Sequence, residues 1–232
     1  MEQKETPVGP SCAACQRDIF DRICIDAKGK GSRGCPTLTR NKVRQDANRE
    51  YHSPQIREFA RQASIQEGEC YANRGSKPYV VQPTKTRIVE ICEFAQKMVY
   101  RRLGLAFCIG LVKEAATVQD ILISRGFEVI SAMCKAGRTS KESIGITEEE
   151  KVFPGMDEPM CNPVYQAKLF NHEKTQFNIL LGLCVGHDSL FFQYAEAPTT
   201  VLAVKDRVTG HNPLVAIYQA DSYYEKIRHP GL

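Results

Sequence analysis

The stretch Leu103-Gly-Leu-Ala-Phe-Cys108 decides the fold that the sequence predicts. Its continuous apolar run is typical of a strand buried on both faces, as the strands of parallel sheets are. Two further runs have the same form and also end in a cysteine, namely Phe127 to Met133 before Cys134 and Phe177 to Leu183 before Cys184. Parallel strands end at one edge of a sheet, where open α/β sheets bind their ligands. We therefore expect the three thiols to share that edge.

Helical patterns alternate with these strands along the chain. We expect a fourth strand at Thr199 to Val204 and a long loop, of the kind that often forms a functional lid, at Lys135 to Met160. Helices are predicted at Pro54 to Glu69, from a cap at Thr84 or Thr86 through Val99, and at Lys113 to Arg125, Pro163 to Asn171, His187 to Ala195 and Pro213 to Lys226. The alternation predicts an α/β fold, a Rossmann-like parallel sheet of about four strands with helices on both faces.

Length and composition restrict the class of protein. A chain of 232 residues with 42% hydrophobic residues accommodates one α/β domain, expected at 51–232, and a small cysteine-rich segment at 1–50. A net charge of +4 gives no reason to expect nucleic acid or a membrane as a partner. The start of the chain, Met-Glu-Gln-Lys-Glu-Thr-Pro, has no apolar region of a signal peptide, and the longest apolar run, Leu103 to Val112, is too short to cross a bilayer. We therefore expect a cytoplasmic protein.

Ten cysteines are the unusual feature of the composition. In a reducing compartment they are better explained as metal ligands or redox thiols than as disulfides. Four of them lie in the first 50 residues, which contain few large apolar side chains and need something other than a core to order them. We predict that they bind a metal or cluster, the ligands being Cys12, Cys15, Cys24 and Cys35.

The spacing of this amino-terminal group indicates which metal it binds. Cys12-Ala-Ala-Cys15 is a Cys-x-x-Cys pair, and Cys35 is followed by Pro36 as in ferredoxin-type motifs, which favours an iron–sulfur cluster of the 4Fe-4S type. Zinc stays open as an alternative because it accepts the same four-sulfur shell. Gln16 follows the pair where covalent haem attachment requires histidine, so haem attachment through a Cys-x-x-Cys-His motif is excluded.

A second cofactor site is expected at the edge of the sheet. Cys161, just before Asn162-Pro163 at a helix start, joins the three strand-end cysteines, so that the predicted ligands are Cys108, Cys134, Cys161 and Cys184. The alternative for each thiol is simple packing, since free cysteine is among the most buried residue types. Packing is our interpretation for Cys70 and Cys92, which lie within helical patterns.

Polar residues follow the strand ends and are candidates for catalysis. His187 and Asp188 come after Cys184, and Lys205 and His211 follow the fourth strand, together with Arg207. The histidines and Asp188 can move protons, while Lys205 and Arg207 can hold a small anionic substrate or an anionic cluster. The alternatives are a helix cap at His187 and Asp188 and a solvated ion-pair network at the cations.

Several motifs resemble those of an uncharacterised family of cysteine-rich proteins found mainly in anaerobic bacteria and archaea. The motifs are Ala-Phe-Cys108-Ile-Gly-Leu, Cys134-Lys135, Cys161-Asn-Pro, Gly-Leu-Cys184-Val-Gly-His-Asp-Ser-Leu, Val-Lys-Asp-Arg207 and Gly-His211-Asn-Pro. The resemblance covers most of the chain and also includes the amino-terminal cysteines. It implies metal binding and names no reaction.

These features together predict an iron–sulfur protein with two metal sites, one relaying electrons to or from a redox partner protein and one open to a substrate. Whether it is an enzyme stays open; an iron–sulfur oxidoreductase is the class that fits. The main alternative is a zinc- or other metal-binding module without catalysis, acting as a sensor, carrier or interaction domain. A thiol enzyme with Cys184 as nucleophile and His187 as base is a third hypothesis, which the three-residue spacing disfavours.

Overall fold

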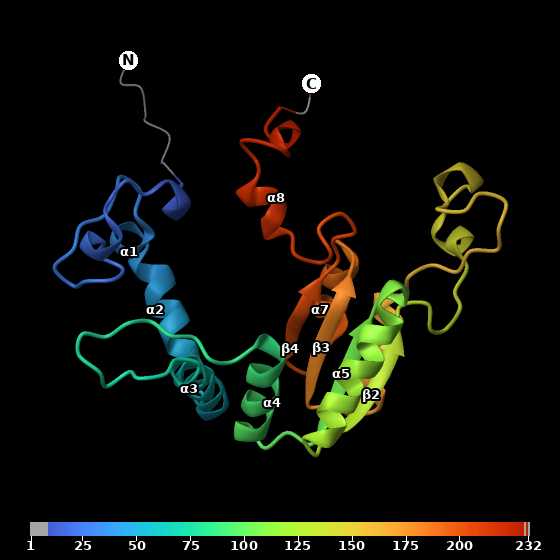
Figure 1. Ribbon diagram of the computed structural model, residues 1–232, viewed down its shortest axis with the longest axis horizontal. Helices are drawn as coiled ribbons and strands as arrows, with labels where there is room; N and C mark the ends of the chain where they lie inside the picture. The colour runs from blue at the N-terminus through green and yellow to red at the C-terminus, as the bar shows by residue number, and fades with distance from the viewer. Residues whose placement is uncertain (1–8, 230, 232) are drawn as a thin grey trace. The chain divides into compact units, whose positions relative to one another are not determined.

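The computed structural model describes residues 9–229 and 231, and these divide into two compact units with a boundary between Ser64 and Ile65. The sequence suggested a boundary at residue 50; the boundary in the structure falls later in the chain, inside one continuous helix, α3 (Pro54–Glu69) (Figure 1). The chain start, on which the expected absence of a signal peptide rests, lies outside the described residues. Among those described, no helix combines the length and the apolar character needed to cross a membrane.

The first unit is small and open. It contains two single-turn 3-10 helices and the helices α1 (Pro36–Thr39) and α2 (Asn41–Glu50). None of the residues from 9 to 64 is buried. Backbone hydrogen bonds between Asp21, Ile23 and Lys30 shape its central loop, with Lys30 N–H donating to Asp21 at 2.7 Å. The expectation that this segment lacks an apolar core is confirmed.

The second unit is built on a parallel sheet, as predicted. Its strands are β1 (Arg102–Phe107), β2 (Glu128–Met133), β3 (Phe177–Leu183) and β4 (Thr199–Val204). Their spatial order is β2-β1-β3-β4, and every described neighbouring pair is parallel. The helices of this unit are α4 (Arg87–Lys97), α5 (Val112–Ser124), α6 (Pro163–His172), α7 (His187–Tyr194) and α8 (Leu214–Tyr218).

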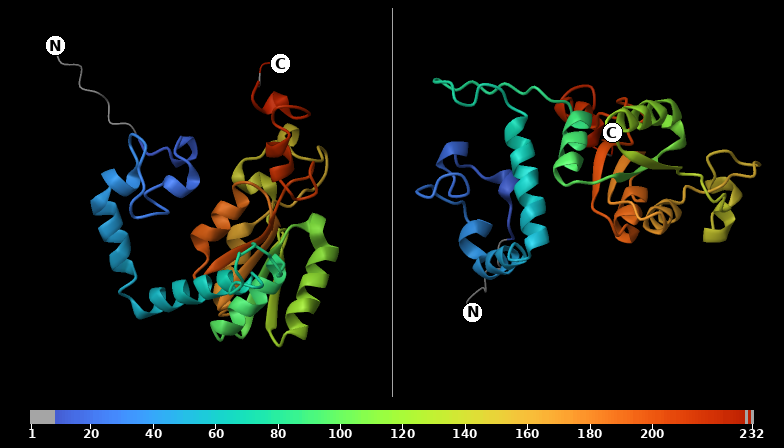
Figure 2. Two further views of the ribbon diagram at one scale, coloured as in Figure 1. Left: turned by 60° about the vertical axis from the view of Figure 1, so that its left-hand side comes forward. Right: turned by 90° about the horizontal axis from the view of Figure 1, so that it is seen from below.

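Helices cover both faces of the sheet, which confirms the predicted α/β architecture (Figure 2). On one face, the rings of Phe170 from α6 and Phe191 from α7 meet edge to face, 5.8 Å apart, in a cluster with Ala106 and Leu180. On the other face, Phe94 of α4 packs on Phe177, with ring centroids 5.6 Å apart. Burial of these side chains from both faces is what makes the central strands continuously apolar.

Gly104 shows why one position of the central strand lacks a side chain. A Cβ atom there would lie 2.4 Å from the Asn178 side-chain oxygen and 2.5 Å from the Phe170 ring. Real Cβ atoms do not approach other atoms so closely, so any larger residue would push α6 away from the sheet. The glycine therefore allows the last turn of α6, which carries Phe170, to pack closely on the sheet.

The last helix is shorter than the sequence predicted. The pattern from Pro213 to Lys226 suggested one helix, whereas α8 ends at Tyr218 and is followed by a 3-10 turn, Glu225–Ile227. The Ser222 side chain donates a hydrogen bond to the Gln219 carbonyl, and Tyr224 N–H donates to the same carbonyl. Such local side-chain bonds compete with helix formation and explain the break.

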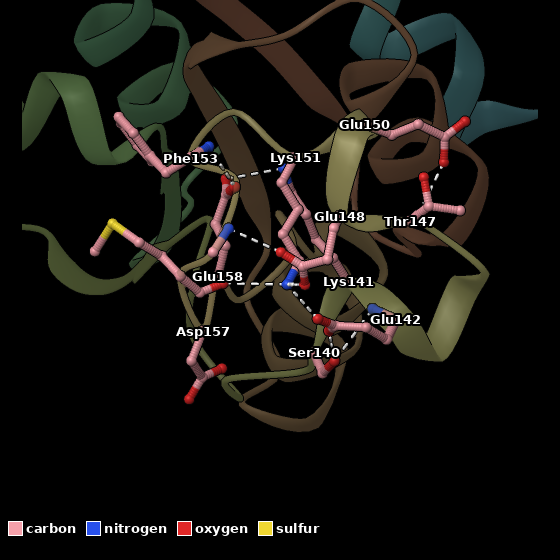
Figure 3. A network of polar contacts seen from close by, with 12 residues as sticks. Ser140, Lys141, Glu142, Thr147, Glu148, Glu150, Lys151, Phe153, Asp157 and Glu158 are labelled. Carbon is pink, nitrogen blue, oxygen red and sulfur yellow. Dashed lines mark hydrogen bonds and ion pairs between the residues drawn. The ribbon is translucent and has the colours of Figure 1, made fainter.

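The long loop between β2 and α6 has a polar core of its own (Figure 3). Lys151, only 3% exposed, pairs with Glu142 at 2.5 Å and with Glu148, and donates to the Met156 carbonyl. Lys141 pairs with Glu158 at 2.8 Å. At its base, Met160 N–H donates to the Thr139 carbonyl at 2.7 Å. The loop is therefore an ordered lobe, and a role as a lid stays a prediction.

Replacing Lys151 by methionine should loosen this lobe. The variant leaves Glu142 and Glu148 facing each other without their cation, so we expect hydrogen exchange of amides 142–158 to speed up by about tenfold or more. Lys151→Arg keeps the charge and serves as the control.

Because Lys151 lowers the pKa of Glu142 to about 2, the ion pair between Lys151 and Glu142 in the wild type should persist as the pH falls from neutral and be lost only near that value. Equal exchange in wild type and methionine variant at pH 7 would contradict the assigned role.

Candidate thiol sites

Two cysteine groups occur in the described residues, one in each unit. All ten cysteines of the chain are free thiols. No three side chains of the types His, Cys, Asp and Glu lie close enough together, within the described part of the chain, to hold a single metal ion. The two groups therefore differ in what they can bind, and each is described by itself.

The amino-terminal cysteines surround one pocket. Its lining includes all four predicted ligands, and its volume is about 440 Å³ with the open mouth included; the four are Cys12, Cys15, Cys24 and Cys35. Three basic residues, Arg22, Lys30 and Arg33, line the same pocket. The four predicted ligands thus line a common pocket, and their binding of a metal or cluster stays a prediction.

Local hydrogen bonds position two of these thiols. The Cys15 sulfur lies 3.0 Å from the Ser32 hydroxyl oxygen, and this hydrogen bond lowers the pKa of the Cys15 thiol. Arg22 donates to the Cys15 carbonyl at 3.1 Å and so ties the Cys-x-x-Cys turn to the central loop. A Cβ atom at Gly31 would lie 2.8 Å from the Cys35 Cβ, so only glycine lets the chain pass so close to that cysteine.

At the sheet edge, the topology brings thiols from different strands together. Because β1 lies between β2 and β3, Cys108 is next to the ends of both neighbours. Cys134 N–H donates to the Phe107 carbonyl at 2.8 Å, and Cys108 N–H donates to the Leu181 carbonyl at 3.1 Å, so each cysteine extends the ladder by one bond. Cys161 arrives from the loop, where Asn162 N–H donates to the Cys134 carbonyl at 2.7 Å.

Three of the four sheet-edge thiols are linked in a row through Cys134. The Sγ atoms of Cys134 and Cys161 are 3.6 Å apart, and Cys134 is also hydrogen-bonded to Cys108. The backbone N–H of Ile109 donates to the Cys134 sulfur at 3.3 Å. Cys108 and Cys134 are 6% and 3% exposed, whereas Cys161 is half-buried and faces the exterior in part. Cys134 is therefore the central member of a three-thiol cluster, Cys108–Cys134–Cys161.

The protonation of this cluster is uneven. Hydrogen bonding to Cys134 is the main cause that lowers the pKa of Cys108 to about 5, and Lys205 contributes. Hydrogen bonds from Cys134 and then from His187 lower the pKa of Cys161 to about 4. The pKa of Cys134 itself lies far above its usual range because it serves both neighbours and is desolvated. Cys108 and Cys161 are thus thiolates at neutral pH, while Cys134 keeps its proton.

The fourth predicted ligand, Cys184, has a different partner. Its sulfur accepts a hydrogen bond from Arg207 at 3.3 Å, and its carbonyl accepts the N–H groups of His187 and Asp188 at the start of α7. His187 contacts Cys161 instead, and this thiolate raises the pKa of the imidazole. The imidazole is thus paired with Cys161, which further disfavours the hypothesis of Cys184 as nucleophile with His187 as its base.

The other predicted catalytic residues fall at different distances from the cluster. Lys205 is hydrogen-bonded to Cys108 and fills the space above Gly110. Asp188 accepts the N–H of Ser189 at 2.8 Å within the first turn of α7. The His211 ring accepts a hydrogen bond from the N–H of Asp206 at 3.2 Å. This bond stabilises the turn after β4 and does not involve a thiol. Of the four, His187 and Lys205 contact the thiols.

One buried residue at this edge was not identified from the sequence. Gln166 of α6 is fully buried and donates to the Ala132 carbonyl at 2.7 Å, and its side-chain oxygen has no hydrogen-bond partner. It lies on the buried face of α6 with Pro163, Ala167 and Phe170. A glutamine in the middle of an apolar helix face is the signal that would have marked it. It ties α6, and with it Cys161, to the end of β2.

Cys70 and Cys92 are both buried in the second unit, as predicted. Cys92 is fully buried in α4. Cys70 donates to the Gln66 carbonyl at 3.1 Å and to Glu90 at 3.2 Å, and desolvation raises its pKa. In the described residues, neither Cys70 nor Cys92 is hydrogen-bonded to a cysteine of the two groups.

Fold and sites together define a cysteine-rich α/β protein with a parallel sheet. The chain belongs to the family described as "Protein of unknown function (DUF1847)", whose model matches residues 35–202. This confirms the predicted membership of an uncharacterised family. The match includes Cys35 and all four sheet-edge cysteines, while Cys12, Cys15 and Cys24 precede it.

A relative and a solved structure are similar to the chain. An archaeal protein, "Uncharacterized protein MJ0455" of Methanocaldococcus jannaschii, is 40% identical over 182 residues, which is 78% of this chain and 90% of the relative. The crystal structure of Dph2 from Pyrococcus horikoshii overlaps 64% of this chain with a TM-score of 0.34 and 15% identity. The overlap covers 34% of the Dph2 chain, and the likeness is too low to bear on function.

Proposed function

We propose that this is an iron–sulfur protein whose amino-terminal pocket binds a 4Fe-4S cluster through Cys12, Cys15, Cys24 and Cys35. The observation that carries the proposal is that all four thiols line one pocket. Soft thiolate sulfurs are the donors that such clusters require. A cluster held there supplies one-electron transfer, so the unit would serve as an electron relay to a redox partner protein.

The spacing of the thiols favours a cluster over zinc. The four sulfurs of a tetrahedral zinc site lie within about 3.8 Å of one another, as Zn–S bonds of about 2.3 Å require. No three potential ligands in the described residues are grouped that tightly around one point. Four thiols that line one pocket without such tight grouping suit a group of several atoms better.

Charge and folding support the same proposal. Arg22, Lys30 and Arg33 line the pocket and can stabilise an anionic cluster. No described residue of the first unit is buried, so a bound group would supply folding free energy that an apolar core does not. The ten free cysteines fit the reducing cytoplasm, where we place the protein.

The sheet-edge group is the proposed reaction centre of the second unit. A second cluster on Cys108, Cys134, Cys161 and Cys184 is the form that the sequence predicted. The contacts join the first three and leave Cys184 with Arg207. With or without a second cluster, His187 and Lys205 stabilise the negative charge of the thiolates. Lys205 and Arg207 provide cationic groups for a small anionic substrate.

Anaerobic purification followed by iron, zinc and acid-labile sulfide analysis tests the proposal. We expect about four irons and four sulfides per chain, with absorbance near 400 nm that bleaches on reduction. Cys15→Ser should remove this content, whereas Cys92→Ala, which changes a buried thiol outside both groups, should keep it. A colourless protein with stoichiometric zinc would replace the cluster by the alternative metal-binding module.

A further inference from the structure

We propose that the three-thiol cluster performs thiol–disulfide exchange, in which Cys161 attacks a small disulfide substrate and Cys134 resolves the mixed disulfide. This activity goes beyond the electron relay of the amino-terminal pocket and does not depend on a cluster bound there. It rests on the geometry of Cys134 and Cys161, on their unequal exposure and on the groups around them.

The two sulfurs are already positioned for a bond. A disulfide has an S–S length of about 2.05 Å, and the Sγ atoms are 3.6 Å apart without any bond between them. The hydrogen bond from Asn162 N–H to the Cys134 carbonyl fixes the two backbones next to each other. Lys135 donates to the Pro159 carbonyl on the same two segments. Side-chain rotation, and no large backbone movement, would therefore close the bond.

Exposure assigns the two roles. Cys161 is half-buried and open to a substrate, whereas Cys134 is 3% exposed and lies behind it. A disulfide arriving from solvent can therefore reach Cys161 first. Cys134 is shielded from solvent and adjacent to Cys161, so it is placed to attack the mixed disulfide formed on Cys161.

The surrounding groups can support both steps. His187 is hydrogen-bonded to Cys161 and so fixes the direction of the attacking sulfur. Cys108 is hydrogen-bonded to Cys134 and adjacent to Lys205, so the resolving sulfur is held in place from the other side. Thiolate is the form of cysteine that attacks a disulfide.

The reaction balances without a further oxidant. The Cys161 thiolate attacks one sulfur of the disulfide R–S–S–R and expels one thiolate. The Cys134 thiol then attacks the Cys161 sulfur, the bond between Cys161 and the substrate sulfur breaks, and a released substrate thiolate takes the Cys134 proton. Two protein thiols are oxidised to one disulfide, and the substrate disulfide is reduced to two thiols; an external dithiol reverses the change.

The substrate class follows from the charges near the cluster. Lys205 adjoins Cys108, and Arg207 is exposed beside Cys184. Cationic groups around the thiols favour an anionic disulfide of low molecular weight. Oxidised glutathione, which carries carboxylates at both ends, is a suitable probe.

Oxidised glutathione added to the reduced full-length protein tests the proposal, with released thiol and disulfide-linked peptides as readouts. We expect a Cys134–Cys161 cross-link and two glutathione thiols released for each. Cys134→Ser should stop at a glutathione adduct on Cys161 with one thiol released, and Cys161→Ser should give neither product. Cys92→Ala is the matched control and should behave as the wild type.

Three results would overturn the proposal. The first is a set of cross-links spread over other cysteines of the second unit. The second is the absence of a glutathione adduct on Cys161 in the Cys134→Ser variant. The third is bound iron in a Cys15→Ser protein that keeps both Cys134 and Cys161 from reacting. The last would instead support a second cluster. A wild type without iron and sulfide at the amino-terminal pocket would contradict the proposed electron relay. The exchange assay would still test the reaction of Cys161 and Cys134 independently.

Discussion

Removal of the proposed cluster should unfold the first unit and leave the second folded. In the full-length protein, we expect chelation under reducing conditions to make residues 9–64 exchange their amides at the rate of an unfolded chain. The sheet strands should stay protected. The reason is that no described residue up to Ser64 is buried, so no apolar core remains there once the group is gone. Structural metals in small domains contribute on the order of 10 kcal/mol to folding, which is more than such a unit has otherwise.

Hydrogen exchange by mass spectrometry, with peptides from both units, measures this effect. Cys15→Ser together with Cys35→Ser should reproduce the chelated pattern without any chelator, because both thiols line the pocket. Cys184→Ser, which alters only the second unit, is the control and should keep the first unit protected. If the metal-free first unit exchanged as slowly as the loaded one, the bound group would not be its source of stability.

The strands were predictable because each is a short apolar run with clear limits. β3 and β4 have the predicted bounds, β1 is shifted by one residue and β2 begins one residue later. Burial from both faces keeps the two central strands, β1 and β3, mostly apolar. The helix after Pro213 was overestimated because side-chain bonds at Ser222 interrupt it, and a periodic apolar pattern does not reveal such local bonds.

The site was predictable in its members more than in its contacts. Parallel strand ends bring Cys108, Cys134 and Cys184 to one edge whatever the strand order. The order β2-β1-β3-β4 is a long-range property, and it decides which neighbours each thiol meets. The pairing of Cys184 with Arg207 and of His187 with Cys161 depends on side-chain directions at turns. Spacing along the chain carries no information on those directions.

The alkylation rate of Cys161 should be almost independent of pH between 6 and 9. The hydrogen bond from Cys134 and then the contact with His187 lower the pKa of Cys161 to about 4, so the thiolate is present throughout that range. An ordinary cysteine with a pKa of about 8.5 loses on the order of a hundredfold of its thiolate between pH 8 and pH 6. Brief iodoacetamide treatment of reduced, metal-free protein, followed by peptide mass spectrometry, measures each thiol separately.

Variants separate the two causes of this reactivity. Cys134→Ala removes the hydrogen bond that contributes most, and the pH at which Cys161 loses reactivity should move up towards that of a free thiol. His187→Asn should move it less, because the imidazole is the second contributor. Cys134, buried and with a raised pKa, should stay almost unlabelled in the native protein at every pH tested. A wild-type Cys161 that gains reactivity only near pH 8.5 would show that Cys134 and His187 do not lower the pKa of the Cys161 thiol. Cys134 would then lack the hydrogen bonds that make it the centre of the cluster.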